Sequence, residues 1–220
     1  MTSLLLSRLH FPIHNLGFGC RAGIWFQGCT VYCRGCVSRD TWPFDPARRS
    51  SVEDVLAWVH ALPAATVDGI TLSGGEPTDQ PGALRELLAG LDDWRIGYGR
   101  PVDLLMYSGR SGEHLDREFG WLADSIDVLV SEPFVAARAT DCALRGSDNQ
   151  IVRTFTDLGR DRYPEATLED GYREQRHNLA VHVDDRAVWM VGIPLPGDLR
   201  RLEHDLAERG IDLTRTSWLT

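Results

Sequence analysis

The 220-residue chain is 43% hydrophobic and 25% charged, which is typical of a folded domain with a sizeable core and excludes collagen, coiled coil and disorder. The net charge is −9 and all 23 basic residues are arginines, so a nucleic-acid partner is not expected and Schiff-base or P-loop lysine chemistry is excluded. The apolar run Leu4-Leu5-Leu6 is too short for a signal peptide or a membrane span, so we expect a cytoplasmic protein without a membrane partner.

Two strands are predicted near the amino terminus, over residues 3–11 and 21–27, with a glycine-containing turn between them. A helix is expected to follow from residue 50. Ser50 and Glu53 have the spacing of a capping box, and the apolar residues after them recur at helical intervals: Val52, Val55, Leu56 and Val59. This apolar face is expected to pack on the core.

The middle of the chain repeats the order strand, loop, helix. Strands are predicted over 67–72, 102–107 and 126–130. The leucines at 84, 87, 88 and 91 and the polar segment 111–119 predict the helices between them. Successive units of this kind predict an α/β fold, with a parallel sheet covered by helices and functional loops at the carboxyl ends of the strands.

The character of the sequence changes after Thr156. Residues 157–176 are charged and lack periodic apolar positions, so we expect a connector there. A hairpin is predicted from 179–183 and 187–191, and a helix from Pro196 to Gly210. We therefore divide the chain into a core, residues 1–155, and a small α+β extension, residues 156–220.

Three of the five cysteines, Cys29, Cys33 and Cys36, form a C-x3-C-x2-C loop. Three thiolates in one loop can bind three irons of a [4Fe–4S] cluster and leave the fourth iron open for a ligand. A zinc site and structural or free thiols are the alternatives. Cys20 and Cys142 lie outside this spacing and are expected to be buried, inert thiols.

A second motif, Gly74, Gly75, Glu76 and Pro77, follows the strand predicted over 67–72. Two glycines at a strand end often form only a tight turn. They also let the backbone approach a ligand closely, and the Glu76 carboxylate could then receive an ammonium group.

Together these motifs resemble the radical S-adenosylmethionine (SAM) superfamily, and within it the activating proteins of anaerobic ribonucleotide reductase. The resemblance covers roughly residues 5–155 and rests on Trp25–Cys29, Cys33–Cys36, Thr41-Trp42, Ile70–Pro77 with Gln80, Tyr107–Gly109, Asp127–Val130 with Phe134, and Arg145–Gln150. It implies an incomplete (βα) barrel of the radical SAM type, here with the small C-terminal α+β extension.

The resemblance also implies roles for individual residues. Cys29, Cys33 and Cys36 would bind the cluster, and SAM would bind the open iron. Gly74, Gly75, Glu76 and Pro77 would hold the amino end of SAM, and Ser108 would reach its carboxylate or ribose. The bound cofactors would generate a 5′-deoxyadenosyl radical that abstracts hydrogen, with electrons from a flavodoxin- or ferredoxin-type reductant.

For the substrate, the resemblance implies a glycyl-radical enzyme such as anaerobic ribonucleotide reductase. One departure concerns Ser131-Glu132-Pro133, where that group commonly has an acidic residue and a glycine. A stand-alone radical SAM enzyme for a small molecule or ribosomal peptide is therefore an alternative. A non-catalytic zinc- or cluster-binding adaptor is a third. Arg145–Gln150 has the composition of a turn, and the resemblance suggests that it lies at the edge of the active site.

Overall fold

The computed structural model describes residues 2–165, 168, 179–183, 188–214 and 216–218. A seven-stranded sheet has the order β3-β1-β2-β4-β5-β6-β7. Its strands are β1 (Ser3–Ile13), β2 (Arg21–Phe26), β3 (Arg49–Ser51), β4 (Gly69–Gly74), β5 (Asp103–Tyr107), β6 (Val128–Ser131) and β7 (Ile151–Thr154). The central strands β2, β4, β5 and β6 are parallel, as predicted, whereas β1, β3 and β7 run antiparallel to their neighbours. Sequence periodicity did not reveal these antiparallel edges.

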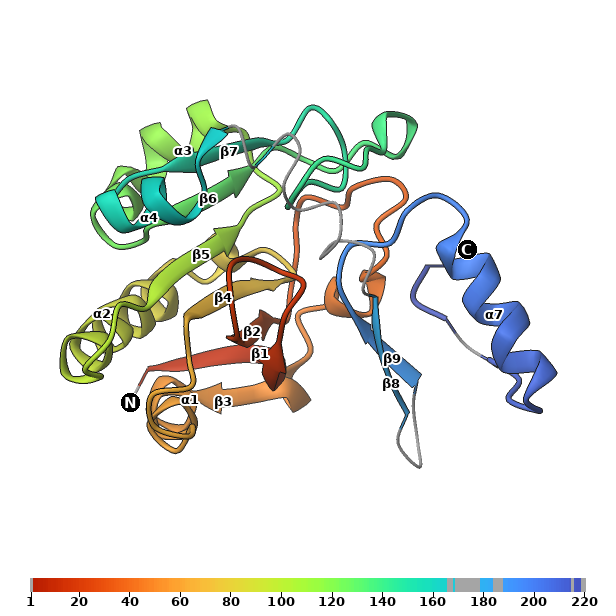
Figure 1. Cartoon of the computed structure of the whole chain (residues 1–220), viewed down its shortest axis with the longest axis horizontal. Helices are drawn as coiled ribbons and strands as arrows, with labels where there is room; N and C mark the ends of the chain where they lie inside the picture. The colour runs from red at the N-terminus through yellow and green to blue at the C-terminus, as the bar shows by residue number, and fades with distance from the viewer. Residues whose placement is uncertain (1, 166–167, 169–178, 184–187, 215, 219–220) are drawn as a thin grey trace.

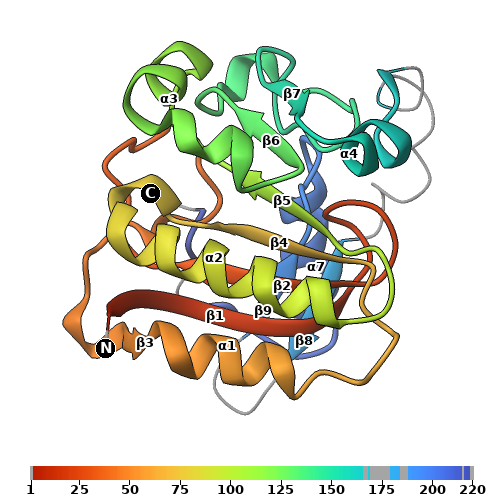
Figure 2. The same cartoon turned by 90° about the vertical axis from the view of Figure 1, so that its left-hand side faces the viewer.

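Helices α1 (Val52–His60) and α2 (Pro81–Gly97) cover one face of the sheet, and α3 (Gly112–Phe119) and α4 (Asp157–Arg162) lie near β6 and β7 (Figure 1). The hairpin of β8 (Ala180–Val183) and β9 (Val188–Val191) lies with α7 (Asp198–Glu208) on the opposite face, as both views show (Figure 2). No described helix is both long enough and apolar enough to cross a membrane.

The main core lies between the sheet and helices α1 and α2. Alternate residues of the strands and one face of each helix are buried there, as the leucine and valine spacing predicts. Among the wholly buried residues are Ile24, Val55, Val59, Ile70, Leu72, Leu84, Leu87, Leu91 and Leu104. This packing holds the carboxyl ends of the parallel strands at one edge of the sheet.

The capping box of α1 lies one residue later than predicted. Ser51 Oγ accepts from the Asp54 amide at 3.0 Å, and the Asp54 carboxylate accepts from the Ser51 amide at 3.4 Å. Ser50 belongs instead to the short strand β3, where it pairs with Leu4. Pairing with β1 therefore moves the start of the helix beyond the serine that the spacing favours.

Residues 157–163 differ from the connector that we expected. They form α4 and end at Tyr163, which is buried and whose hydroxyl accepts a hydrogen bond from Arg21 Nη1 at 3.0 Å. Packing on the core thus orders a segment without apolar periodicity. Residues 166–167 and 169–176 of the expected connector lie outside the described residues.

The later elements of the extension agree with the predictions, with shifted bounds. Strands β8 and β9 pair antiparallel, with Val183 opposite Val188. Helix α7 begins at Asp198, after Gly197 with a φ of 95°, so Pro196 precedes the helix rather than opening it. Leu206 of this helix is buried.

Candidate functional site

The cysteine loop begins where β2 ends and is fixed by backbone hydrogen bonds on both sides. The Gly28 amide donates to the Thr41 carbonyl at 2.7 Å, and the Cys29 amide donates to the Trp42 carbonyl at 3.0 Å. From the other side, the Glu76 amide donates to the Gly28 carbonyl at 2.8 Å. Three segments that are distant in sequence therefore meet at the first cysteine.

The three cysteines of the loop lie close enough to influence one another. Burial raises the pKa of each thiol, and for Cys33 the neighbouring Cys36 and Cys29 raise it further. Such thiols stay neutral unless a nearby cation stabilises their thiolates, which is the effect that bound iron has. Cys36 Sγ also accepts from the Ser38 amide at 3.4 Å. This backbone contact and the neighbouring Trp42 side chain oppose the rise of the Cys36 pKa.

This donor set fits an iron–sulfur cluster, in which each thiolate binds a different iron. Within the described part of the chain, no three His, Cys, Asp or Glu side chains are arranged to hold a single metal ion.

The glycines of the second motif are required by close packing between loops. A Cβ atom on Gly74 would lie 2.4 Å from the backbone nitrogen and oxygen of Phe26, and the φ of Gly74 is 109°. A Cβ atom on Gly75 would lie 2.1 Å from the Gly28 carbonyl oxygen. Both glycines thus let this loop lie directly against the start of the cysteine loop.

Glu76 is wholly buried and connects two strand-end loops. Its Oε1 accepts from the Thr78 amide at 3.0 Å, from Thr78 Oγ1 at 2.7 Å and from Ser108 Oγ at 2.9 Å, and its Oε2 accepts from the Gly109 amide at 2.8 Å. Burial raises the pKa of Glu76, although these hydrogen bonds oppose the shift. Glu76 and Ser108 are therefore hydrogen-bonded to each other. The contacts that we predicted between these two residues and SAM remain untested predictions.

An arginine that sequence reasoning missed connects the cysteine loop to both of these loops. Arg110 donates through Nε to Thr78 Oγ1 at 3.0 Å and through Nη2 to Thr30 Oγ1 at 2.9 Å, and it forms an ion pair with Asp79. Asp79 in turn accepts from the Thr30 amide at 2.7 Å. The only signal in the sequence was the position of Arg110 directly after a strand-end Ser-Gly pair.

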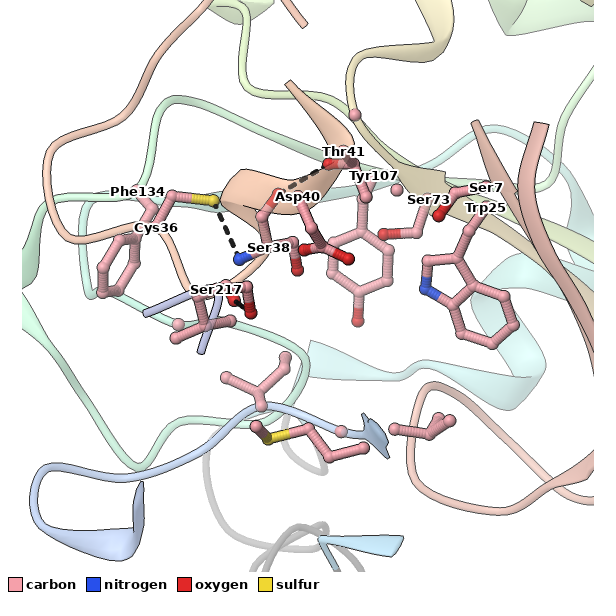
Figure 3. A pocket seen from close by; sticks show the side chains of 18 of the residues that line it. Ser7, Trp25, Cys36, Ser38, Asp40, Thr41, Ser73, Tyr107, Phe134 and Ser217 are labelled. Carbon is pink, nitrogen blue, oxygen red and sulfur yellow. Dashed lines mark hydrogen bonds between the residues drawn. The ribbon is translucent and has the colours of Figure 1, made fainter. Parts of the chain in front are cut away.

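A cavity of about 330 Å³ lies beside these loops. The predicted residues Cys33, Cys36, Gly74, Gly75 and Ser108 line it, whereas Cys29, Glu76 and Pro77 are not among its lining residues. The side chains of Trp25, Asp40 and Tyr107 also project into it (Figure 3). Parallel strands thus bring both sequence motifs to one hollow.

The extension forms another wall of the same cavity. Residues 188–194, Ser217 and Trp218 line it, and Ser217 Oγ donates to the Val37 carbonyl at 2.6 Å. Trp189 lies under the guanidinium of Arg8, whose carbon is 3.9 Å from the ring centroid, and stacks on His182 at 4.0 Å. The contact with Arg8 joins the hairpin to β1, whereas the stack on His182 lies within the hairpin.

The turn Arg145–Gln150 reaches the cavity through Gly146 and Gln150. Gln150 accepts from the Gly146 amide at 2.7 Å and donates to the Glu132 carbonyl at 3.2 Å. Phe134 also lines the cavity, whereas Ser131-Glu132-Pro133 is not among the lining residues.

The expectation of two buried thiols was wrong, because Cys20 and Cys142 are partly exposed. Trp25 packs on a small apolar cluster of Ile13, Leu16 and Val191 and also lines the cavity, and Gly23 leaves space for its ring. A Cβ atom on Gly23 would lie 2.2 Å from the indole.

Comparison with known proteins agrees with the donor set. A family model described as "4Fe-4S single cluster domain" matches residues 15–153. The chain belongs to this family of radical SAM proteins. Its cofactors are therefore a [4Fe–4S] cluster and SAM.

Curated relatives are activating proteins. The chain is 30% identical over 145 residues to the anaerobic ribonucleoside-triphosphate reductase-activating protein of Haemophilus influenzae, covering 63% of this chain and 90% of the relative. The protein of the same name from Pasteurella multocida is 30% identical over 153 residues, covering 64% and 90%. The pyruvate formate-lyase-activating enzyme of Staphylococcus aureus is 25% identical over 190 residues, covering 80% and 74%.

Among solved structures, that of QueE from Escherichia coli matches with a TM-score of 0.40 at 18% identity. The match covers 50% of this chain and about half of that chain, 53%.

Proposed function

We propose that this radical SAM protein activates a glycyl-radical enzyme by removing a hydrogen atom from one glycine of that enzyme. The observation that carries the proposal is the meeting of the cysteine loop and the Gly74–Pro77 loop at one cavity. The names of the relatives support a protein substrate. When bound, the cluster and SAM supply a 5′-deoxyadenosyl radical, for which a flavodoxin- or ferredoxin-type protein provides the electron.

In this proposal, Cys29, Cys33 and Cys36 bind three irons. Gly74 and Gly75 present backbone groups to the amino end of SAM, since both line the cavity. Ser108 lies beside them. Glu76 and Pro77 act mainly by holding this loop, because the Glu76 carboxylate bonds within the chain.

We further propose that the core, residues 1–155, forms an incomplete barrel and that the extension, residues 156–220, limits access to it. The open strand order, with β3 and β7 at the two edges, supports the first part. The position of β9 along the cavity supports the second. Tyr163 and α4 pack on the core, so the structural boundary of the extension lies after them.

Electron paramagnetic resonance of the anaerobically reconstituted, dithionite-reduced protein tests the cofactor site. We expect a [4Fe–4S]⁺ signal that changes when SAM is added and disappears in Cys33→Ala. Cys142→Ala is the matched control and should retain both properties. Stoichiometric zinc without a cluster signal would instead support the adaptor.

Mixing the reduced protein and SAM with a glycyl-radical enzyme tests the substrate. We expect a glycyl radical signal on the partner and one 5′-deoxyadenosine per radical formed. Failure with every glycyl-radical enzyme of the same organism would contradict the proposal while leaving the cofactor site intact.

One observation favours a second candidate, a stand-alone enzyme for a small molecule or ribosomal peptide. The cavity is enclosed partly by the extension, and its volume is near the lower end of the range for small-ligand sites. Multiple turnovers on a non-protein substrate would favour this candidate over the activating role.

A further inference from the structure

Hydrogen bonds hold the chain on both sides of Cys29, the first cysteine of the loop. On one side, the Gly28 carbonyl accepts from the Glu76 amide at 2.8 Å. On the other side, the Thr30 amide donates to Asp79 Oδ2 at 2.7 Å. The residues directly before and after this cysteine are therefore both bonded to the same neighbouring loop.

The side chain of Arg110 joins this arrangement from a third loop. Its Nη2 donates to Thr30 Oγ1 at 2.9 Å and pairs with Asp79, and its Nε donates to Thr78 Oγ1 at 3.0 Å. Asp79 Oδ1 also accepts from Thr30 Oγ1 at 2.9 Å. One guanidinium group thus connects the residue after Cys29 to two residues of the neighbouring loop.

The backbone of Arg110 leads back to the other side of the cysteine. The Arg110 amide donates to Ser108 Oγ at 3.2 Å, and Ser108 Oγ donates to Glu76 Oε1 at 2.9 Å. The contacts therefore form a continuous path that runs through Thr30, Arg110, Ser108, Glu76 and Gly28. The two ends of this path are the residues that flank the first cysteine.

Most of this path is shielded from water, although part of the arginine is exposed. Glu76 and Ser108 are buried, and the Asp79 side chain is 6% exposed, whereas that of Arg110 is 25% exposed. Charge-assisted hydrogen bonds are stronger than neutral ones, and a guanidinium group gives several of them in a fixed geometry. The ion pair therefore constrains the loop more than a fully exposed pair would.

The third cysteine is held in a different way. The Cys36 amide donates to the Cys33 carbonyl at 3.1 Å, and Cys36 Sγ accepts from the Ser38 amide at 3.4 Å. Both contacts lie within the cysteine loop or directly after it. The position of Cys29 relative to Cys36 therefore depends on the contacts that other loops make around Cys29.

We propose that Arg110 and Asp79 are positioning residues, which hold Cys29 in place for the cluster and fix the cysteine loop relative to the Gly74–Pro77 loop. This inference rests on the proposed function, because it takes Cys29 as a cluster ligand and Gly74–Pro77 as the SAM loop. Neither residue is among those that line the cavity, so both act through the loops. Removing groups that orient a metal ligand typically weakens metal binding or activity about 10–100-fold.

The test uses the reconstituted full chain. Iron release is followed with a coloured Fe(II) chelator, and SAM binding is followed by the change in the [4Fe–4S]⁺ signal during a titration. Arg110→Met removes the donors and keeps much of the side-chain length. We expect iron release about tenfold faster and SAM binding about tenfold weaker than in the wild type. Arg160→Met, which breaks an exposed pair with Asp157 in α4, is the matched control and should behave as the wild type does.

Two further variants separate positioning from folding. Thr30→Val replaces one hydroxyl on an exposed residue, so it should fold as the wild type does and change both measurements in the same direction by a smaller factor. Arg110→Lys keeps the charge but presents its donors from one atom, so it should restore part of the loss. Urea denaturation of the cofactor-free proteins shows whether each variant is folded under the assay conditions.

Asp79→Asn tests whether the two positioning residues act as one unit. Alone, it should have nearly the same effect as Arg110→Met. Combined with Arg110→Met it should add little, because both substitutions break the same set of contacts. Additive effects on iron release would contradict the proposal.

The outcomes distinguish this inference from the proposed function. If folded Arg110→Met and Thr30→Val keep the wild-type iron release or the wild-type SAM affinity, the positioning proposal is wrong and the proposed function is unaffected. If Arg110→Met does not fold, Thr30→Val and Arg110→Lys decide by the same criteria. Absence of any cluster in the wild type would contradict the proposed function itself.

Discussion

At the amino ends of β2, β4 and β5, the wholly buried Arg21 binds the Asp103 carboxylate, whereas at their carboxyl ends the equally buried Glu76 meets only neutral donors. Arg21 also donates to Thr71 and to the Ile70 carbonyl, and it crosses directly over Gly69. Burial alone would lower the pKa of Arg21, but the Asp103 carboxylate and Tyr163 raise it above its usual value.

The difference separates a closed end of the sheet from an open one. At the amino end, the chain fills the space with its own ion pair, and Arg162 adds a second cation to Asp103. At the carboxyl end, hydrogen bonds hold the loops while a cavity stays beside them. The closed end therefore serves stability, and the open end has room for ligands.

Removing the buried cation should have the largest effect. Arg21→Met leaves the Asp103 carboxylate buried without its main partner, so we expect the free energy of unfolding to fall by about 3–5 kcal/mol. Urea denaturation of the protein without cofactors measures this. Arg117→Met, in an exposed pair with Glu118, should leave the midpoint unchanged. If both variants lost the same free energy of unfolding, the buried ion pair at the closed end would contribute no more to stability than a surface pair.

Gly75→Ala should disturb the open end through crowding. Its Cβ atom would meet the Gly28 carbonyl oxygen, so the cysteine loop has to shift, at a cost of about 1–3 kcal/mol. We also expect less iron per chain after reconstitution. Gly82→Ala, in the first turn of α2 with no atom near its Cβ, should instead stabilise by about 0.4–1 kcal/mol. Full iron content in Gly75→Ala would show that the loops adapt freely.

Glu76→Gln tests whether neutral donors alone hold the open end. The Gly109 amide and the Thr78 amide point at different carboxylate oxygens, so a glutamine NH₂ group must face one of these donors. We expect a loss of roughly 1 kcal/mol of unfolding free energy. Glu118→Gln on the surface is the control. If the free energy of unfolding of Glu76→Gln equals that of the wild type, one of these hydrogen bonds contributes nothing to stability.

The smallest effect concerns the hairpin that covers the cavity. Burial, then His182 and Arg8, lower the pKa of His10, so the folded protein favours neutral His10. The stabilisation is present above the usual pKa of histidine, about 6.5, and is lost as the pH falls through the lower pKa of the folded state.

Hydrogen exchange of β8 and β9, corrected for the intrinsic pH dependence, measures this loss. We expect protection of the hairpin to decrease between neutral pH and about 5.5. His10→Phe keeps a ring beside Trp189 and should make protection less dependent on pH. His60→Gln, at an exposed position of α1, should behave as the wild type does. A pH response that persists in His10→Phe would assign it to another group.

The sequence by itself was sufficient for most of the helices and strands and for the two motifs. Helical spacing of leucines and strand-like apolar runs reflect which side chains must leave water, and this pattern is local. Likewise, the spacing of Cys29, Cys33 and Cys36 is a property of one loop, so the cluster prediction needed no fold. The family comparison confirms the cofactors.

Only the tertiary structure decided which distant groups meet. The antiparallel edges, the Arg110–Asp79 pair and the burial of Tyr163 depend on contacts between segments far apart in the chain. The same holds for Glu76, whose partners come from two loops, and for Trp25 and Trp189, which pack on a small apolar cluster and line the cavity at the same time. Side-chain type limits what a residue can bind, but the packing of the sheet determines what lies within its reach.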